Sequence, residues 1–365
     1  MGLQCGIIGI TNVGKTTIFN CMSSTKAQAS SFAFSCNKSN ISIINVPDDR
    51  LYVLEKFQPT DRTVHTTVEI VDIPGLAKGA NKGEGMGNSF LGDIRNCDAL
   101  IHVLRCFDDE NLPHVDGSVD PVRDIETVNF ELQVKDLESI EKKIQRLEKL
   151  VKTGDKDAKH GIEVLKVYKD HLESFQSART APVEEHDKRF IADLFLLSTK
   201  PVIYVCNVDE SSAVNGNKYV EKVKEFFKNE ETEILIIAGK VEADIAELDS
   251  QEDRIAFLKD VGLTEPGVNK LIRAAYTLLD LETFFTIGQK ENRAWTIKKG
   301  MTAPQAAGVI HSDLERGFIR AEVIKYKDFI ELGSEHACKE KGKLHVEGKT
   351  YIVEDGDILH IRFNV

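Results

Sequence analysis

Short apolar segments alternate with helix-like spacings over the first third of the chain. Four of these segments have the length and the turn-flanked composition of buried strands: Cys5–Ile10, Ser42–Val46, Thr67–Asp72 and Ala99–Leu104. Strands that alternate with helices are typical of a mostly parallel sheet with helices on both faces. The pattern returns later, with candidate strands at Pro201–Cys206 and Glu233–Ala238 and a candidate helix at Gly267–Leu279. The chain is therefore predicted to contain a doubly wound α/β domain.

Between these two stretches the apolar residues recur every three or four positions, and charged residues fill the gaps. The first such run starts at Phe130 and continues with Val134, Leu137, Ile140, Ile144, Leu147 and Val151. A turn is predicted at Thr153-Gly154-Asp155, and a return helix should carry Ile162, Leu165, Tyr168, Leu172 and Phe175. This spacing is typical of amphipathic helices. We therefore expect an antiparallel helical hairpin, inserted at residues 128–197.

The segment from Leu281 to the end mixes strand-like pieces with glycine-rich turns. The expected strands are Arg293–Ile297, Ala321–Ile324, Tyr351–Val353 and Ile358–Phe363, with one short helix around Pro304–Ile310. We predict a small α+β domain at residues 281–365. The α/β domain then comprises residues 1–127 and 198–280, on either side of the hairpin.

Composition restricts the function only broadly. The 365 residues carry a net charge of −12, which argues against indiscriminate nucleic-acid binding and gives no reason to expect DNA as a partner. No apolar run approaches the roughly 20 residues that cross a bilayer, and no basic leader precedes the first strand, so no membrane partner is expected. The seven cysteines lack CxxC and Cys/His ligand spacings, which favours free thiols in a reducing cytoplasm.

The most informative motif lies between the first strand and the first helix. The run from Gly9 to Thr17 fits GxxxxGK[ST], whose glycines let backbone N–H groups surround phosphates at a helix N-terminus. Lys15 would reach the β- and γ-phosphates, and the Thr16 hydroxyl would take one Mg²⁺ position. A plain glycine turn is the alternative, and the strand–loop–helix context disfavours it. The predicted nucleoside triphosphate site comprises Asn12, Val13, Gly14, Lys15, Thr16 and Thr17.

A second motif, DxxG, ends the candidate strand Thr67–Asp72 about 60 residues further on. Asp72 would hold Mg²⁺ through a water, and the Gly75 amide would contact the γ-phosphate. Glycines after this motif suggest a switch segment, with a flexible surface loop as the alternative. Ras-type GTPases place a water-orienting glutamine directly after DxxG, where this chain has Leu76. The best candidate to orient the water in its place is His114, which lies in a polar loop, because histidine exchanges protons near neutral pH. The alternative is an exposed loop histidine without a role.

The identity of the base depends on the loop after the strand Pro201–Cys206. GTPases have NKxD there, and the aspartate accepts two hydrogen bonds from guanine. Here Asn207 is followed by Val208, and the last position is Glu210, whose side chain is one methylene longer. Adenine presents its amine to a single acceptor, which the Val208 carbonyl could supply. We therefore expect ATP to bind better than GTP, with Ala238 and Gly239 in the last base-contacting loop.

These residues, and much of the rest of the chain, resemble the YchF/Obg-like ATPase family of P-loop proteins. The resemblance includes Glu69-Ile70-Val71-Asp72-Ile73, the run from His102 to Phe107, and the NxxE loop at Asn207–Glu210. Leu76 matches the hydrophobic residue that this family has in place of the water-orienting glutamine. In the last segment, Arg293–Ile297, Thr302–Ala307 and Gly317–Val323 resemble its TGS domain, a β-grasp-like module.

The resemblance implies an ATPase that tolerates GTP, depends on Mg²⁺ and associates with the ribosome. It also implies that His114 is the catalytic histidine, and we assign a catalytic role to Lys15 of the phosphate-loop motif as well. Asn12 resembles an asparagine through which related proteins bind an activating K⁺, with a plain turn residue as the alternative. One departure concerns the metal: the family threonine that completes the Mg²⁺ shell is Cys36 here, and a neutral thiol is a poor ligand for a hard cation.

Basic residues are compatible with a ribosomal partner at the hairpin and at the small domain. Lys142, Arg146, Lys149 and Lys152 form a stripe at helical spacing, for which a solvated face is the alternative. Three functions stay open at this stage. The first is a ribosome-associated ATPase, the second a nucleotide-gated binding module with negligible hydrolysis, and the third a GTPase that assists ribosome assembly.

Overall fold

The computed structural model describes residues 3–23, 40–75 and 86–364, and it forms two compact units. Among these residues, the first unit comprises the chain up to residue 23, residues 40–42 and residues 69–271. The second unit comprises residues 43–68 and 272–364. The hairpin is part of the first unit. The division into three domains made from the sequence stays a prediction.

The first unit contains most of a six-stranded sheet, two strands of which extend across the boundary between the units. In spatial order its strands are β2 (Asn40–Asn45), β4 (Thr67–Asp72), β1 (Gln4–Ile8), β5 (Ala99–Cys106), β6 (Val202–Val208) and β7 (Ile234–Ile237). From β4 to β7, neighbouring strands pair in parallel. All eight residues of β5 are buried, and six of them are apolar, as expected for a central strand covered on both faces. The predicted parallel sheet is confirmed, with strand ends shifted by one or two residues.

The helices of the first unit alternate with these strands or follow one another along the chain. They are α1 (Lys15–Ser23), α3 (Met86–Asn96), α4 (Pro121–Val151), α5 (Lys156–Glu173), α6 (Lys218–Phe226), α7 (Gly239–Glu247) and α8 (Gln251–Asp260). Helix α9 (Gly267–Leu278) runs across the boundary into the second unit. A core cluster joins Leu104 and Tyr204 of the sheet to Ile125 of α4, Val220 of α6 and Val241 of α7.

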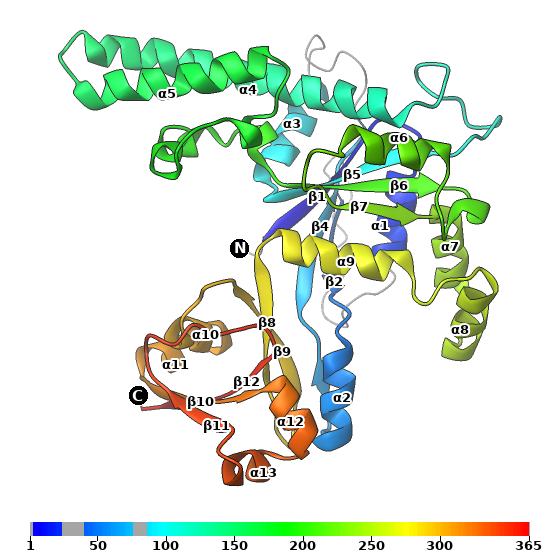
Figure 1. Ribbon diagram of the computed structural model, residues 1–365, viewed down its shortest axis with the longest axis vertical. Coiled ribbons are helices and arrows are strands. Elements are labelled where there is room, and N and C mark those ends of the chain that lie inside the picture. Colours follow the sequence, from blue (N-terminus) through cyan, green and yellow to red (C-terminus); the bar gives the residue numbers. More distant parts are fainter. Residues whose placement is uncertain (1–2, 24–39, 76–85, 365) are drawn as a thin grey trace. The chain divides into compact units, whose positions relative to one another are not determined.

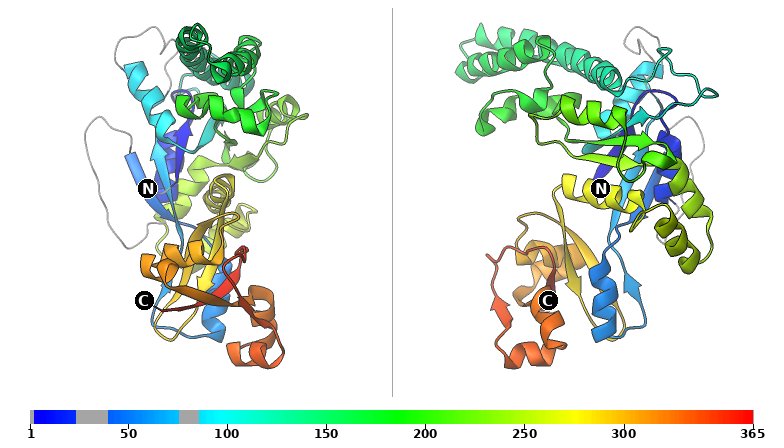
Figure 2. Two further views of the ribbon diagram at one scale, coloured as in Figure 1. Left: turned by 90° about the vertical axis from the view of Figure 1, so that its left-hand side faces the viewer. Right: turned by 45° about the vertical axis from the view of Figure 1, so that its right-hand side comes forward.

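Helices α4 and α5 lie side by side and antiparallel, as predicted (Figures 1 and 2). The turn between them contains Gly154 at φ 90°, a conformation that favours glycine. Helix α4 begins earlier than expected, at Pro121, because Asp120 caps it by accepting hydrogen bonds from two backbone N–H groups. Phe175 was wrongly expected on the buried face of the return helix. It lies beyond the end of α5 and is 69% exposed.

Four short 3₁₀ helices lead from the hairpin back to the sheet, and a fifth follows β6. They are η1 (Ala178–Thr180), η2 (Glu185–Phe190), η3 (Ala192–Leu194), η4 (Leu197–Thr199) and η5 (Glu210–Ser212). Asp136 of α4 accepts hydrogen bonds from the backbone N–H groups of Leu197 and Ser198, both at 2.7 Å, and from the Ser198 hydroxyl at 2.6 Å. This buried carboxylate therefore ties the long helix to η4.

The second unit is built on another six-stranded sheet. In spatial order its strands are β11 (Leu344–Glu347), β10 (Phe318–Lys325), β12 (Asp357–Phe363), β8 (Leu281–Thr286), β9 (Asn292–Lys298) and β3 (Thr63–Val64). Its helices are α2 (Asp49–Phe57), α10 (Ala303–Ile310), α11 (Ser312–Arg316), α12 (Tyr326–Leu332) and α13 (Glu335–Glu340). The prediction of one helix was therefore wrong. The predicted strand Tyr351–Val353 is reduced to a single bridge between Thr302 and Ile352.

Residues 43–68 belong to this unit although they lie far away in the sequence. Leu51 and Leu54 of α2 are fully buried against Phe285 and Phe329. A second cluster, with Phe284, Ala306 and Val323, fills the space between the sheet and α10. The unit thus has cores on both faces of its sheet. No helix in the described part of the chain is long and apolar enough to cross a membrane.

Candidate functional site

The loop between β1 and α1 has the backbone of a phosphate-binding loop. Gly9, Asn12 and Gly14 have φ angles of 144°, 63° and 95°, respectively. These values turn the chain sharply between the strand and the helix, and they need glycine at two of the three positions. The helix starts at Lys15, so the free N–H groups of its first turn face the loop. The structure thus gives the predicted motif the backbone that its chemistry requires.

Lys15 is nearly buried in this loop. Its Nζ atom donates a hydrogen bond of 2.6 Å to the Ile10 carbonyl. Burial lowers the pKa of Lys15 from 10.5 to about 8, and the negative charge of Asp72 acts in the opposite direction. Gly75 lies directly beside the ammonium group, since a Cβ at that position would come within 2.9 Å of Nζ. The cation is therefore held where β1 and β4 end.

A small cavity next to Lys15 has the side chains of a metal and phosphate site. Its volume is about 250 Å³, and its lining includes Asn12, Lys15, Thr16, Asp72 and Gly75. The Thr16 hydroxyl donates to Asp72 Oδ2 over 3.3 Å. Burial raises the pKa of Asp72, while the bond from Thr16 and the charge of Lys15 lower it. A hydroxyl and a carboxylate oxygen at the phosphate-binding loop suit Mg²⁺, a hard cation that prefers oxygen ligands.

A larger cavity of about 900 Å³ shares Asn12, Lys15 and Thr16 with the smaller one. Its lining joins the ends of β5 and β6 to the starts of α1 and α7: Asn12, Gly14, Lys15, Thr16, Thr17, Phe107, Asp108, Asp109, Leu112, Asn207, Val208, Asp209, Glu210, Ser211, Gly239, Lys240 and Ala243. Ligands of open α/β sheets bind at such carboxyl ends of strands. The cavity continues from the phosphate loop to the predicted base loop, so it has the place and the size for a nucleoside.

Asn207 connects three loops of this cavity. Its Nδ2 group donates to the Val13 carbonyl over 2.9 Å, and its Oδ1 atom accepts from the Gly239 N–H group over 2.9 Å. The residue is buried, and the amide oxygen also satisfies the N-terminus of α7, whose own cap residue, Ala238, offers no side-chain acceptor. Asn207 therefore holds the base loop and the phosphate loop together.

Four carboxylates line the same cavity, and three of them accept hydrogen bonds from other residues of the protein. Asp108 accepts from the Tyr219 hydroxyl at 2.7 Å, and Asp109 accepts from the Asn111 N–H group at 2.9 Å. Asp209 accepts from the hydroxyl and the N–H group of Ser212. Glu210 is exposed and makes no side-chain hydrogen bond to any described residue. Of the four, it is the carboxylate free to meet a base.

Comparison with known proteins places this site in a family. A model of the C-terminal region of YchF GTPases, described as a protein of unknown function (DUF933), matches residues 281–364, and a model described as a 50S ribosome-binding GTPase matches residues 4–166. The curated protein "Ribosome-binding ATPase YchF" of Bacillus subtilis is 47% identical over 367 residues, with both chains fully covered. The chain belongs to the YchF family.

Two further relatives support this assignment. The protein of the same name from Escherichia coli O157:H7 is 47% identical over 365 residues, again with full coverage of both chains. The solved structure of the Schizosaccharomyces pombe YchF GTPase aligns with a TM-score of 0.88 at 33% identity and covers 99% of this chain and 98% of its own. The predicted family and fold class are thereby confirmed.

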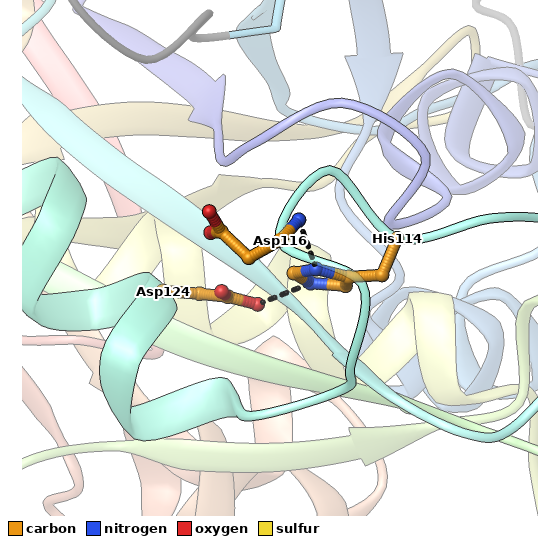
Figure 3. A group of neighbouring side chains, drawn as sticks. All are labelled: His114, Asp116 and Asp124. Carbon is orange, nitrogen blue, oxygen red and sulfur yellow. Dashed lines mark hydrogen bonds and ion pairs between the residues drawn. The ribbon is translucent and has the colours of Figure 1, made fainter.

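Among the described residues, three that were predicted for this YchF-family site line neither cavity: Val13, Ala238 and His114. His114 Nε2 is 3.1 Å from Asp124 Oδ2 at the start of α4, and His114 Nδ1 accepts a hydrogen bond of 3.1 Å from the Asp116 N–H group (Figure 3). Only 3% of the His114 side chain is exposed. The loop itself reaches the phosphate loop, since Asn12 Nδ2 donates to the Pro113 carbonyl over 3.4 Å. In this arrangement the ring faces α4 and not the predicted phosphate site.

The structure sorts the other predicted residues by their place. Gly14, Lys15, Thr16, Thr17, Val208, Glu210 and Gly239 line the larger cavity, and Thr16, Asp72 and Gly75 line the smaller one. Val13 and Ala238 are buried behind these walls and contribute backbone. Cys36 and Leu76 lie outside the described residues. Sequence reasoning missed Phe107, Asp108, Asp109 and Leu112, because no motif marks a wall made by an irregular loop.

The basic stripe predicted on the hairpin is free of ion pairs among the described residues, whereas two cations of the second unit, Arg316 and Lys325, are paired. Lys142, Arg146, Lys149 and Lys152 of the hairpin are exposed, and none forms an ion pair with a described residue. In the second unit, Arg316 pairs with Asp313, and Lys325 pairs with Glu354 and Asp357 at 2.8 Å each. Trp295 is partly buried on the core, and its Nε1 group donates to the Thr286 hydroxyl at 2.9 Å, as expected for a core tryptophan.

Proposed function

We propose that the protein is a Mg²⁺-dependent ATPase that associates with the ribosome. The observation that carries this proposal is the continuous site formed by the phosphate loop, Lys15 and the purine-sized cavity at the ends of β5 and β6. The names of the Bacillus subtilis and Escherichia coli relatives, which are 47% identical over the whole chain, support both the reaction and the partner.

Different residues of the site would bind the phosphates and the metal. Lys15 and the N–H groups of the first turn of α1 would neutralise the β- and γ-phosphates. Thr16 and Asp72 would hold Mg²⁺, which supplies charge stabilisation for phosphoryl transfer when it is bound. In the reaction, water attacks the γ-phosphorus, the bond to the β–γ bridging oxygen breaks, and ADP and phosphate leave. His114 would orient that water, which requires the ring to leave Asp124.

The preference for ATP over GTP is part of the proposal. Asn207 is committed to Val13 and Gly239, so its amide is not available to the base, and backbone groups near Val208 would recognise the adenine amine. Guanine recognition needs a carboxylate that accepts two hydrogen bonds at fixed geometry. Glu210 is exposed and has no partner that fixes its side chain, whereas one carbonyl oxygen is enough for the adenine amine.

One observation favours a second function. With His114 bound to Asp124, the ring that would orient water lies outside the smaller cavity. A nucleotide-gated binding module with negligible hydrolysis would have this arrangement in its bound state as well. For the third candidate, a GTPase assembly factor, the name of the Schizosaccharomyces pombe YchF GTPase supports the nucleotide alone.

Two measurements separate these functions. Calorimetric titration of the protein with ATP and with GTP, each with Mg²⁺, should give tighter binding of ATP, and a Glu210→Ala variant should keep its ATP affinity. Tighter binding of GTP, lost in Glu210→Ala, would contradict the base assignment. Single-turnover hydrolysis of ATP, with and without ribosomes, then tests the reaction. A rate at the level of free ATP under both conditions would favour the binding module.

A further inference from the structure

Arg105 is the second-last residue of β5. Its side chain is a fully buried cation next to a loop that lines the larger cavity. It is 2% exposed, and in the part of the chain that the structure describes it forms no ion pair. Burying a guanidinium is costly unless its donors find partners. Since no described carboxylate compensates the charge of Arg105, other acceptors must bind the guanidinium donors.

The partners of Arg105 are three carbonyl groups of one irregular loop. Its Nε group donates to the Phe107 carbonyl over 3.1 Å, Nη1 donates to the Leu112 carbonyl over 2.6 Å, and Nη2 donates to the Asp109 carbonyl over 3.2 Å. The guanidinium carbon also lies 4.8 Å from the centre of the Phe107 ring, at cation–π distance. One side chain thus fixes the backbone of residues 107–112 at three points.

The same loop is a wall of the nucleoside cavity. Phe107, Asp109 and Leu112 all line that cavity, and all three carbonyls bound by Arg105 belong to these lining residues. The outer side of the wall is held differently. Asn217 Nδ2 donates to the Cys106 carbonyl at 2.7 Å, and the Tyr219 hydroxyl donates to Asp108. Arg105 is therefore the internal anchor of this wall.

We propose that Arg105 is a positioning residue that shapes the base-binding wall and so determines the affinity for the purine. This inference rests on the proposed function, because it takes the cavity to hold the base of a nucleotide. Its physical basis is the planar fork of arginine, whose donors point in fixed directions, whereas lysine offers one ammonium on a flexible stem. A lysine at this position keeps the charge but cannot hold three carbonyls in the same geometry.

The test separates the base from the phosphates. Affinities of wild type and Arg105→Lys are measured for ATP and for inorganic tripolyphosphate, each with Mg²⁺; tripolyphosphate occupies the phosphate loop without touching the wall. We expect ATP binding by Arg105→Lys to be weaker by roughly tenfold or more, and tripolyphosphate binding to stay within about twofold of wild type. Equal losses for both ligands, or no loss for either, would overturn the inference.

A matched control comes from the opposite end of the same sheet. Lys200 is a second partly buried cation whose Nζ donates to backbone carbonyls, those of Arg95 and Cys97, and it lines neither cavity. Lys200→Met should leave both affinities within about twofold of wild type. Failure of the wild type to bind ATP would contradict the proposed function itself, whereas normal binding by Arg105→Lys contradicts only the role of Arg105.

A measurement on the wild type keeps the inference testable if the variant does not fold. A wall anchored by Arg105 should be ordered before nucleotide binds. Hydrogen exchange of the Asn111 and Leu112 amides, which bond to the Asp109 side chain and carbonyl, should then be slow without ligand. Exchange at the rate of an open loop would contradict the inference.

Discussion

The Nε2 atom of His114 lies 3.1 Å from Oδ2 of Asp124, and both side chains are almost completely withdrawn from solvent. The second ring nitrogen accepts a hydrogen bond from the Asp116 N–H group, so neither nitrogen is free to act on a water molecule. Burial raises the pKa of Asp124, and the hydrogen bond from His114 lowers it. The pair is thus a resting arrangement that the proposed reaction must open.

The first prediction concerns this pair. Asp124→Asn keeps the shape of the side chain but removes its charge, and a neutral acceptor binds the ring roughly half as strongly. The ring should then leave its resting position more often, and the single-turnover rate of ATP hydrolysis should rise a few-fold. The measurement is quenched-flow hydrolysis at saturating ATP.

The control for this prediction is His114→Ala, which should bind ATP normally and lose most of its hydrolysis. If Asp124→Asn instead slows hydrolysis to the level of His114→Ala, the carboxylate orients the catalytic ring and the resting-state interpretation fails. If His114→Ala hydrolyses ATP like the wild type, the histidine has no part in the reaction.

The second prediction concerns Asn207. Asn207→Ala leaves the buried Val13 carbonyl and the Gly239 N–H group without partners, at a cost of about 1–3 kcal/mol. ATP and GTP affinities should fall by the same factor, because the amide binds protein atoms and not the base. The measurements are thermal unfolding and calorimetric titration with both nucleotides. A change in the ratio of the two affinities would show that Asn207 reads the base.

A matched amide in the second unit provides the control. Asn292 is fully buried, its Nδ2 group donates to the Gln58 carbonyl at 2.8 Å, and its Oδ1 atom accepts from the Gly288 N–H group at 3.1 Å. Asn292→Ala should destabilise the fold by a similar amount, about 1–3 kcal/mol. Its affinity for ATP should remain that of the wild type.

Asn207 also shows what the sequence can and cannot predict. The motif places the asparagine at a strand end, and in the structure it lies near the end of β6 and lines the larger cavity. Its bonds, however, reach residues 194 and 32 positions away, and such distances carry no periodic or spacing signal. Local patterns were enough to select Lys15, Thr16 and Asp72, which line one cavity in the structure, because strand–loop–helix geometry is itself local.

The third prediction concerns Gly14. Its φ angle is 95°, and a Cβ at this position would lie 2.2 Å from Asn207 Nδ2. Gly14→Ala therefore combines backbone strain of about 1–3 kcal/mol with the loss of the Asn207 bridge. We expect ATP affinity to fall by at least tenfold, as measured by calorimetry.

Gly92 in helix α3 is the control for that substitution. A Cβ at Gly92 would meet nothing within 4 Å, and the residue lies inside a helix. Gly92→Ala should raise the stability by up to about 1 kcal/mol through helix propensity and leave nucleotide binding unchanged. Normal ATP binding by Gly14→Ala would show that the loop adopts another conformation with ligand.

The fourth prediction follows from the pKa of Lys15. This pKa is lowered to about 8 by burial, so the free protein loses the ammonium charge as the pH rises through 8. Phosphate binding needs the charged form, so ATP affinity should be highest below pH 8 and roughly tenfold lower at pH 9 than at pH 7. Lys15→Arg, which stays charged, should bind ATP with little change over this range. An affinity of the wild type that is constant between pH 7 and pH 9 would contradict the assignment.

The limits of the sequence are clearest in the second unit and in the hairpin. The sequence around Leu51 and Leu54 gave no indication that these residues of α2 pack in one core with Phe285, some 230 residues further along the chain. The helices α12 and α13 have seven and six residues, too few for a helical period to stand out. Phe175 continued the apolar spacing of α5, but the helix ends two residues before it. In each case tertiary contacts or the position of a helix end decided the structure, and the spacing of apolar residues predicts neither.

The fifth prediction concerns the basic stripe on α4. Lys142, Arg146 and Lys149 are exposed and have no ion-pair partner among the described residues, whereas Lys143 of the same helix pairs with Asp193. Cations without carboxylate partners remain available to RNA phosphates. Reversal of these three charges to glutamate should reduce cosedimentation with ribosomes several-fold, and the remaining binding should depend less on salt.

The comparison that makes this result specific is a variant with the same change in net charge elsewhere on the first unit. Lys222 and Lys228, on or next to α6, and Lys259 of α8 are also exposed. Glutamate at these three positions should leave ribosome binding unchanged, because long-range repulsion is screened beyond about 8 Å at physiological ionic strength. Equal losses in both variants would show that net charge and not the hairpin controls association. Normal binding by the hairpin variant would place the ribosomal contact on another surface.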